Sequence, residues 1–590
     1  MTGYRPPVDD ILAALDAAAG LAALAETERF AEAGGELARQ VVEEGGRMAA
    51  ELAAPLDQPG DRTGARFENG VVRMPDGFAD VYRAYCEAGW NGIAADPAYG
   101  GGGLPFVLAL AVQECWTAAN MAFSLCPMLN QGAIEALSQH GSPELKARYL
   151  PKLVSGEWTG TMCLTEPQAG SDVGALKTRA EPAGDGSYRL FGQKIFITYG
   201  EHDMAENIIH LVLARLPDAP AGTKGISLFL VPKFLPDADG RPGARNDVAC
   251  LSIEHKLGIH ASPTCVMGFG ERGEGAVGFL VGEENRGMRH MFTMMNHARI
   301  NVGLQGVAIA ERAFQRALAF ARERLQGRDP VSGAHPAPII AHADVRRMLM
   351  RMKALTLAAR AIVYHTGSAV DRAHALADAQ ARAAAQMRAD LLTPVAKAFS
   401  TDIGVEAASL GIQVHGGMGY IEETGAAQHL RDARIAPIYE GTNGIQAMDL
   451  VTRKIPMADG GAFRALAAEI REEAAGWRDG DPRASFAAAI RAAADRLEKA
   501  SAWVLTALKE GRELDAHAAA APLVQLYGGV VGAWLLAREP IAADAEGAAA
   551  MRAVARRFFI AQILPEKLAQ WDAITAGADV LYALPAEAWR

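Results

Sequence analysis

Apolar residues recur at helical spacing through the first 160 residues of the chain. The alanine-rich stretches at 10–24 and 27–50 have apolar side chains three or four positions apart, as expected for helices with one buried face. A glycine run at 100–103 predicts a loop. It lacks the preceding strand and following helix of a dinucleotide-binding turn, so a phosphate-binding role is not favoured there.

The pattern changes near Thr159, where short β-like runs replace the helical spacing. Gly, Pro and Asp residues separate these runs, as in strands joined by turns. The runs follow one another too closely for helical crossovers, which favours an antiparallel sandwich or barrel. The predicted strands cover 188–191, 195–198, 208–213, 226–231 and 277–281.

Helical spacing returns after the strands and continues to the C-terminus. Long helices are predicted at 344–372 and 375–400, and the stretch at 457–461 predicts a linker into a last helical block. Two sets of residues each share one helical face. They are Phe314, Leu318, Ala321 and Leu325 in the first part, and Phe463, Leu466, Ile470, Ala474 and Trp477 in the last.

These patterns predict a mainly α fold with a central β domain. At 590 residues the chain is too long for one core, and three or four domains are usual for this length. The predicted division is a helical N-terminal domain at 1–160, a middle β domain at 161–285, a four-helix-bundle domain at 286–455 and an additional helical domain at 461–590.

Composition and charge exclude several classes of protein. Half of the residues are apolar and 22% are charged, as in soluble globular proteins, and the net charge of -11 argues against a general nucleic-acid-binding role. The six cysteines form no CxxC pair and no zinc-type cluster, so we expect free thiols, a reducing compartment and no metal site. The N-terminus is not a signal peptide. No apolar run reaches transmembrane length, since 106–112 is far too short, and we therefore expect a cytoplasmic protein without membrane insertion.

The strongest candidate for chemistry is Glu440, which is followed at once by Gly441 and Thr442. A carboxylate is the simplest group that takes a proton from a carbon next to a thioester. The motif follows a glycine turn at 413–420 by about twenty residues. Three of the four motifs that come before that turn are a loop at 162–172, a strand-like run at 192–198 and a helical stretch at 295–300. The fourth is an arginine-rich stretch at 321–328.

The order of these motifs resembles the acyl-CoA dehydrogenase flavoprotein family over roughly residues 80–455. The resemblance implies an N-terminal helical domain, a middle β domain and a helical bundle, with FAD as cofactor and an acyl-CoA as substrate. The residues implied to bind FAD are Met162, Leu164, Thr165, Gly170, Ser171, Phe196, Thr198, Arg324, Gln413, Gly416, Gly417 and Thr442. Those implied to bind the substrate are Ser171, Asn296, Arg299, Tyr439 and Gly441.

The resemblance also implies a reaction, the α,β-dehydrogenation of an acyl-CoA thioester. Glu440 takes the α-proton as general base, and the β-hydrogen leaves as hydride to the flavin. Some family members carry the base beside the arginine that corresponds to Arg299, but that neighbour is Ala298 here, so the base has to come from the later loop. Three departures from the usual family pattern are Phe196 for Trp, Asn296 for an acid and Gly444 for Gln.

The length of the chain resembles a large bacterial group of the family, which includes the 3-methylmercaptopropionyl-CoA dehydrogenases of dimethylsulfoniopropionate degradation. Electron-transfer flavoprotein is then the expected electron acceptor, and a homo-oligomer is expected, with a dimer favoured over a tetramer. One alternative is an acyl-CoA oxidase that passes electrons to oxygen. Another is a DNA-associated flavoprotein of the same fold, but residues 461–590 hold fifteen Lys or Arg against seventeen Asp or Glu, so this block lacks the basic face that DNA binding requires.

Overall fold

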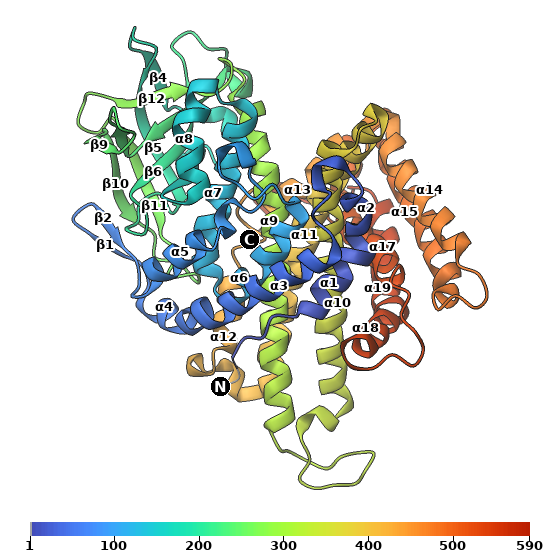
Figure 1. The fold of residues 1–590 in the computed structure, drawn as a ribbon. Coiled ribbons are helices and arrows are strands. Elements are labelled where there is room, and N and C mark those ends of the chain that lie inside the picture. The colour runs from blue at the N-terminus through green and yellow to red at the C-terminus, as the bar shows by residue number, and fades with distance from the viewer. Residues whose placement is uncertain (1–2, 590) are drawn as a thin grey trace. The chain divides into compact units, whose positions relative to one another are not determined.

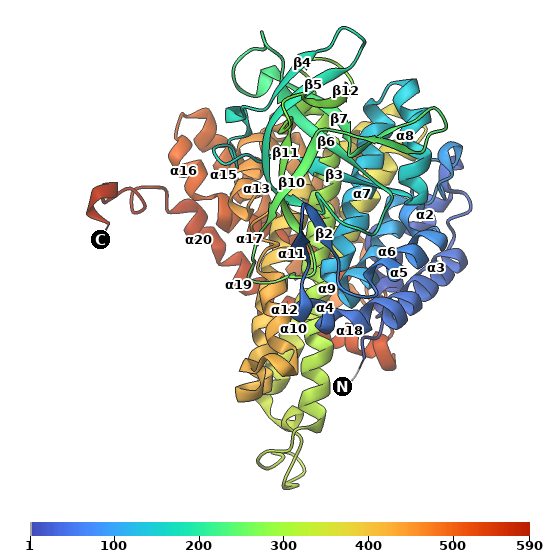
Figure 2. The same cartoon turned by 90° about the vertical axis from the view of Figure 1, so that its left-hand side faces the viewer.

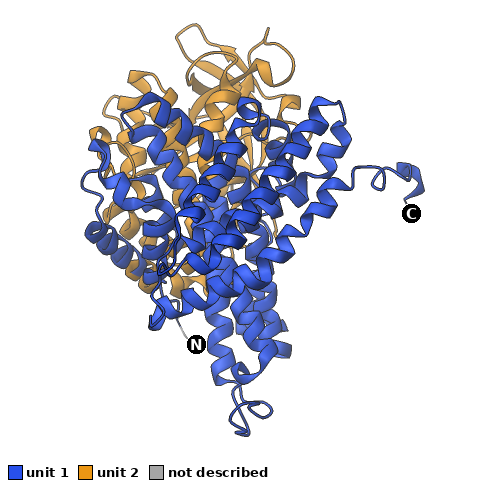
Figure 3. Cartoon of the chain, turned by 90° about the vertical axis from the view of Figure 1, so that its right-hand side faces the viewer, with its two compact units in different colours: residues 1–46, 105–114, 299–590 blue, residues 47–104, 115–298 orange. Residues whose placement is uncertain are grey.

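The computed structural model describes residues 3–589, which fold into two compact units. Figure 1 shows the ribbon, Figure 2 shows it after a quarter turn, and Figure 3 colours the two units. Unit 1 holds residues 1–46, 105–114 and 299–590, and unit 2 holds residues 47–104 and 115–298. Three of the four boundaries fall inside helices, namely α3 (Gly35–Met48), α6 (Phe106–Ala119) and α9 (Gly287–Glu323), and the fourth lies just before α6.

A sheet of eight strands forms the centre of unit 2, in the order β10-β11-β5-β12-β7-β6-β3, with β4 paired to β5 and β6 (Figure 1). The apolar, β-branched sequences of β6 and β7 are buried along nearly their whole length, which is typical of central strands. The strands are β3 (Trp158–Cys163), β4 (Arg179–Pro182), β5 (Tyr188–Thr198), β6 (Asn207–Arg215), β7 (Ile226–Pro232), β10 (Val248–Ile253), β11 (Thr264–Phe269) and β12 (Ala276–Leu280).

The sheet confirms a central β domain but corrects two details of the prediction. The runs at 188–191 and 195–198 belong to one strand, β5, because Gly192 between them continues the strand with a φ of 149°, which favours glycine. The sheet is not purely antiparallel, since β3 pairs with β6 in parallel. Strand β3 is buried throughout and follows α8 directly, so it showed no alternating pattern.

Helices and two small hairpins complete unit 2. Helices α7 and α8 pack against β3. Asn120 caps α7 by accepting a hydrogen bond from the Phe123 N–H at 3.0 Å, and Ser142 caps α8 ahead of a first-turn proline. The remaining elements are α4 (Asp57–Thr63), α5 (Phe78–Glu87), α7 (Met121–His140), α8 (Pro143–Ser155) and the hairpin strands β1 (Arg66–Glu68), β2 (Val71–Arg73), β8 (Phe234–Pro236) and β9 (Pro242–Arg245).

Long helices dominate unit 1. Helices α10 (Ala343–Ala375) and α11 (Ala379–His415) pack along each other, and α9 ends at Glu323. The predicted face of α9 is therefore wrong at Leu325, which lies beyond the helix and is exposed. The predicted helix at 375–400 is also too short, because α11 continues through a further apolar run to His415.

The N-terminal segment and the link from α11 to the C-terminal segment are made of short helices. The predicted stretch at 10–24 is interrupted at Gly20, which adopts a left-handed conformation with φ of 65°. The short helices are α1 (Val8–Ala14), α2 (Leu21–Ala25), α12 (Ala426–Ala433) and α13 (Asn443–Asp449).

The C-terminal segment contains seven helices among the residues described (Figure 2). The predicted apolar face is buried on and just after α14, and the predicted linker forms a break in which Ala458 and Asp459 adopt left-handed conformations. The helices are α14 (Gly461–Gly476), α15 (Ala487–Lys509), α16 (Glu513–Ala518), α17 (Ala520–Ala537), α18 (Gly547–Phe558), α19 (Leu564–Leu568) and α20 (Gln570–Thr575).

Helix α17 corrects the expectation that no apolar run reaches transmembrane length. Its 18 residues are long and apolar enough by that test, but 78% of them are buried within the protein. This is the environment of a core helix, which is apolar on all sides because neighbouring helices surround it. None of the six cysteines forms a disulfide, and no group of residues suited to a metal ion occurs within residues 3–589.

Candidate active site

The loop between α12 and α13 presents Glu440 in a strained backbone conformation. Glu440 has a φ of 55° and Gly441 a φ of 80°, so two consecutive residues are left-handed. Such a conformation is uncommon for a residue other than glycine. Backbone strain of this kind occurs mainly at functional sites. Thr442 then starts α13, because its Oγ1 accepts a hydrogen bond from the Ile445 N–H at 3.1 Å.

The environment of Glu440 disfavours its charged form. Burial raises the pKa of the carboxyl to about 7, although the positive charges of Arg299 and Lys397 act in the opposite direction. Within residues 3–589 no group hydrogen-bonds to this carboxylate and no cation lies within ion-pair distance. A carboxyl with a pKa near the working pH is suited to accept a proton from a weak carbon acid.

Arg299 and Tyr439 lie close to this loop, as the sequence predicts. Arg299 is buried on α9, and burial lowers the pKa of its guanidinium. The Tyr439 hydroxyl donates a hydrogen bond to Gln305 of the same helix. A Cβ atom at Gly441 would meet Nε2 of Gln446 at 2.8 Å, and the φ of 80° at this position is strained for any residue other than glycine.

Lys397 is a buried cation that the sequence analysis missed. It lies on α11, and its Nζ donates a hydrogen bond to Oδ1 of Asn443 at 2.9 Å. Burial lowers the pKa of its ammonium to about 7, against the opposing effect of Glu440 and Asp402. A signal was present, because Lys397 is the lone charged residue in the stretch of α11 between Asp390 and Asp402.

In unit 2, a buried ion pair stiffens the loop that carries Thr165 and Ser171. Lys194 Nζ lies 2.8 Å from the Glu166 carboxylate, which also accepts hydrogen bonds from the backbone N–H groups of Lys177 and Thr178. Burial alone would raise the pKa of Glu166, but Lys194 and these hydrogen bonds lower it to about 2. The loop is therefore held in one shape by a permanently charged anchor.

Phe196 has the second unusual conformation among the predicted site residues. Its φ is 59° and its side chain is 58% exposed, although it lies in the middle of β5. The pairing of β5 with β11 shifts register beside it, between the partners of Ile197 and Lys194. Such a bulge redirects a side chain out of the sheet and is common beside active sites. An exposed aromatic ring held in this way suits a flat, apolar ligand.

Comparison with known proteins gives four consecutive matches along the chain. Residues 35–157, 161–271 and 285–455 match the N-terminal, middle and C-terminal domains of acyl-CoA dehydrogenases, and residues 466–585 match an acetyl-CoA dehydrogenase C-terminal-like domain. A 3-methylmercaptopropionyl-CoA dehydrogenase of Ruegeria pomeroyi is 46% identical over 98% of this chain and 99% of its own length. The chain belongs to the acyl-CoA dehydrogenase family.

Solved structures agree with this acyl-CoA dehydrogenase fold. Caenorhabditis elegans ACDH-11 in complex with C11-CoA has a TM-score of 0.77 at 20% identity and covers 96% of this chain and 93% of its own. An acyl-CoA dehydrogenase complexed with FAD from Bacillus anthracis has a TM-score of 0.74 at 23% identity and covers 91% and 88%. The fourth domain of this acyl-CoA dehydrogenase is thus part of a fold seen elsewhere.

The cofactor of this acyl-CoA dehydrogenase is FAD, and the described residues fit it. An isoalloxazine ring needs an aromatic or apolar face and polar groups at its edge, and Phe196 and the half-buried Thr165 and Thr198 are of these types. Gly170 and Ser171 are exposed on the loop that Glu166 anchors, where small side chains allow backbone N–H groups to approach a phosphate.

The other predicted contacts of this dehydrogenase lie in two further places. Met162 is buried on β3, Leu164 follows that strand, and Asn296 lies half-buried on α9. Arg324 and the glycine turn come from the C-terminal ends of α9 and α11, where the rings of Phe320 and His415 stack at 4.5 Å. At this end Arg324, Gln413, Gly416 and Gly417 are all exposed.

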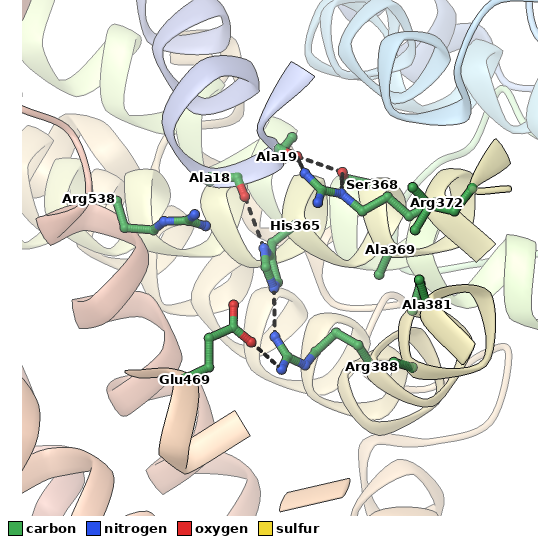
Figure 4. Close-up of a pocket in the computed structure, with 13 residues that line it drawn as sticks. Ala18, Ala19, His365, Ser368, Ala369, Arg372, Ala381, Arg388, Glu469 and Arg538 are labelled. Carbon is green, nitrogen blue, oxygen red and sulfur yellow. Dashed lines mark hydrogen bonds and ion pairs between the residues drawn. The ribbon is translucent and has the colours of Figure 1, made fainter. Parts of the chain in front are cut away.

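A pocket of about 300 Å³ elsewhere in unit 1 contains none of the predicted site residues (Figure 4). Its polar side chains mostly bond to one another. Arg388 donates to Glu469 at 2.6 Å, and Arg372 donates to the carbonyl of Ala19 at 3.3 Å. Burial lowers the pKa of His365 to about 3, so this side chain stays neutral. Residues of α11 and of the C-terminal segment line the pocket, and no residue of the Glu440 loop is among them.

Proposed function

We propose that this acyl-CoA dehydrogenase uses Glu440 as the base that removes the α-proton of the acyl-CoA. The proposal rests on the carboxylate itself, which is held left-handed, lacks an ion-pair partner among residues 3–589 and has a pKa raised to about 7. Such a base is partly ionised at neutral pH and basic enough to take a proton from carbon. When bound, FAD supplies the chemistry that accepts the β-hydrogen as hydride.

The neighbouring residues have separate roles in this proposal. Gly441 leaves room beside the carboxylate, and Tyr439 ties the loop to α9 through Gln305. Arg299 and Lys397 place positive charge near Glu440. They therefore keep part of the base ionised, while burial keeps its proton affinity high. In unit 2, Thr165, Ser171, Phe196 and Thr198 hold the flavin, with Lys194 and Glu166 fixing the loop.

The proposed substrate is 3-methylmercaptopropionyl-CoA or another short or medium acyl-CoA. The 46% identical relative that carries this name aligns over nearly the whole chain and supports this choice. The chain then acts in dimethylsulfoniopropionate degradation, in the cytoplasm, as a homodimer that passes electrons to an electron-transfer flavoprotein. The predicted division into domains at 1–160, 161–285, 286–455 and 461–590 belongs to the same proposal.

Replacement of the base tests this mechanism. Glu440→Gln keeps the shape of the side chain but cannot accept a proton, so kcat falls by a factor of about 10²–10⁴ while FAD stays bound. Glu423→Gln, which changes an exposed glutamate nearby in the chain, is the matched control and retains full activity. Turnover of Glu440→Gln at the wild-type rate would refute the assignment.

A spectral titration tests the substrate. The holoenzyme is mixed without oxygen with a panel of acyl-CoAs, and the loss of flavin absorbance identifies those that are oxidised. We expect bleaching at the lowest concentration with 3-methylmercaptopropionyl-CoA. Oxygen uptake during turnover without another acceptor would instead favour the acyl-CoA oxidase alternative, and salt-dependent binding of duplex DNA would favour the DNA-associated alternative.

A further inference from the structure

Asn443, the residue after the Thr442 cap, connects the Glu440 loop to α11. Its Nδ2 donates hydrogen bonds to Oδ1 of Asp402 at 2.7 Å and to the carbonyl of Ala398 at 3.1 Å. Its Oδ1 accepts the hydrogen bond from Lys397 at 2.9 Å. The acceptors on one side and the donor on the other fix which way the amide faces. Asp402 therefore determines that an oxygen, and not an N–H group, is presented to Lys397.

Asp402 is in turn held by the C-terminal segment. Its Oδ2 accepts a hydrogen bond at 2.8 Å from Nε2 of Gln525 on α17. The Oε1 of Gln525 accepts one at 2.9 Å from Lys567 on α19. Gln525 is therefore oriented like Asn443, with its N–H group toward the carboxyl of Asp402 and its oxygen toward a lysine. The result is a continuous chain of hydrogen bonds, Lys567–Gln525–Asp402–Asn443–Lys397, which we name the relay.

Close packing holds the relay at the point where α17 meets α11. A side chain at Gly528 would overlap the ring of Phe399, which is fully buried on α11 between Lys397 and Asp402. A side chain at Gly529 would overlap Lys567. These consecutive glycines let the two helices and α19 approach closely, so the polar groups meet at hydrogen-bond distance in a partly buried place.

An unmade hydrogen bond is costly where a group is shielded from water, as at the buried side chains of Lys397 and Lys567. A buried donor or acceptor without a partner costs about 1–3 kcal/mol. In the relay, the side-chain N–H group and the oxygen of Asn443 and of Gln525 each have a partner. A change of donor or acceptor at one member therefore disturbs the hydrogen bond of the next. The charged groups that face Glu440 and Lys397 are Arg299 from α9 and Asp402 from α11, and Lys567 acts on Asp402 from α19.

We infer that the C-terminal segment positions the Glu440 loop through the relay, with Gln525 as the positioning residue that joins the segment to Asp402 and Asn443. This inference rests on the proposed role of Glu440 for its effect on catalysis, but not for its effect on the order of the loop. It gives the segment a direct part in the active site of the same unit. Neither Gln525 nor Lys567 touches the reacting atoms.

The test exchanges donors and acceptors within the relay of the full-length holoenzyme. Gln525→Glu replaces the N–H donor by an oxygen, so two acceptors face each other at Asp402. We expect kcat to fall about tenfold with little change in KM, because small displacements of a reacting group cost up to about 10²-fold. Amide hydrogen exchange in residues 438–446 becomes faster in the same variant, since the loop loses its anchor.

The double variant Asp402→Asn with Gln525→Glu restores a donor between the two side chains, since the new asparagine donates to the new glutamate. We expect it to recover most of the lost kcat and the slow exchange of the loop. A loss in Gln525→Glu that the double variant does not recover would overturn the inference, because packing and not the order of donors would then carry the effect. Gln525→Met, which has neither donor nor acceptor, repeats the loss if Gln525→Glu fails to fold.

Glu469→Gln is the matched control. It also removes a polar tie between α11 and the C-terminal segment, the 2.6 Å ion pair with Arg388 in Figure 4. Arg388 and Asp402 are fourteen residues apart on α11, or about 21 Å along the helix. We expect this variant to leave kcat and the exchange of 438–446 unchanged.

The two readouts separate the relay from the identity of the base. Unchanged exchange and unchanged kcat in Gln525→Glu would overturn the inference whatever the role of Glu440. Faster exchange combined with an active Glu440→Gln enzyme would support the relay and refute the proposed base.

Discussion

Two clusters of buried charge in unit 1 behave in opposite ways. The first, the paired cluster, consists of Asp10, Glu114, Glu311, Lys353 and Arg360. Arg360 holds Glu114 at 2.7 Å and Glu311 at 3.2 Å, and Lys353 holds Asp10 at 2.6 Å. Burial opposes ionisation of four of these groups, yet the ion pairs lower the pKa of Asp10 and Glu311 and raise that of Lys353 and Arg360.

The second, the Glu440 cluster, consists of Glu440, Arg299 and Lys397. Here the effect of burial exceeds that of the neighbouring opposite charges. The pKa of the carboxyl is therefore raised, and the pKa values of both cations are lowered. The clusters differ in the direct ion pairs of the first, which Glu440 and Lys397 lack among residues 3–589. Direct pairs keep buried groups permanently charged, which suits a structural role, whereas separated charges stay close to the point of titration, which suits proton transfer.

Removal of Arg360 should produce the largest change in stability. Arg360→Met leaves Glu114 and Glu311 buried without this cation, so we expect the free energy of unfolding to fall by about 5 kcal/mol, the upper part of the range for a broken buried pair. Denaturant unfolding in saturating FAD measures the change. Arg360→Lys, which keeps a charge, is the control and loses less. An unchanged free energy of unfolding in Arg360→Met would mean that the ion pairs of Arg360 do not stabilise the paired cluster.

The same substitution at two buried lysines compares a paired with an unpaired cation. Lys194→Met leaves the Glu166 carboxylate buried without its partner, so we expect a loss of about 3 kcal/mol and a lower FAD content, read from the ratio of flavin to protein absorbance. Lys397→Met removes a cation that has no ion pair among residues 3–589 and whose charged form is already disfavoured. Because Thr401 also donates to Oδ1 of Asn443 at 3.2 Å, the free energy of unfolding should change by less than about 1 kcal/mol. Equal losses in the two variants would contradict the distinction.

The pH dependence of activity gives the smallest and sharpest test. Glu440 must be ionised to accept a proton, and its pKa is raised to about 7, so kcat/KM should fall about tenfold per pH unit as the pH drops below that value. In Lys397→Met one nearby cation is lost, the carboxylate is stabilised less, and the acidic limb moves to higher pH. Arg360→Lys should leave the limb in place. If kcat/KM of the wild type fell only near the ordinary pKa of glutamate, burial would not be raising the pKa of this base.

Much of the fold could be predicted because it depends on local periodicity. Helical spacing identified α10, α14 and most of α11, and the apolar runs identified β6 and β7. The errors lie where tertiary contacts override local pattern. Leu325 continues the spacing of α9 but lies beyond its end, and β3 showed no alternation because it is buried on both faces.

The candidate site was predictable in part. Glu440, Arg299, Tyr439 and Gly441 were named from their motifs, and the structure places them together. Lys397 was not named, because one lysine in an apolar helix does not show which groups it faces. The ion pair of Glu166 with Lys194 was also missed, since the two residues are 28 positions apart and neither motif refers to the other.

By itself, the sequence determined the order of the motifs, the helical and β segments and the family to which they belong, because these depend on residue type and spacing along the chain. Only the tertiary structure decided the left-handed conformations of Glu440 and Phe196, the separation of paired from unpaired charges, and the contact of Gln525 with Asp402, 123 residues away. The reason is physical. Strain, burial and the satisfaction of a buried hydrogen bond are properties of groups brought together from distant positions, and no local pattern encodes them.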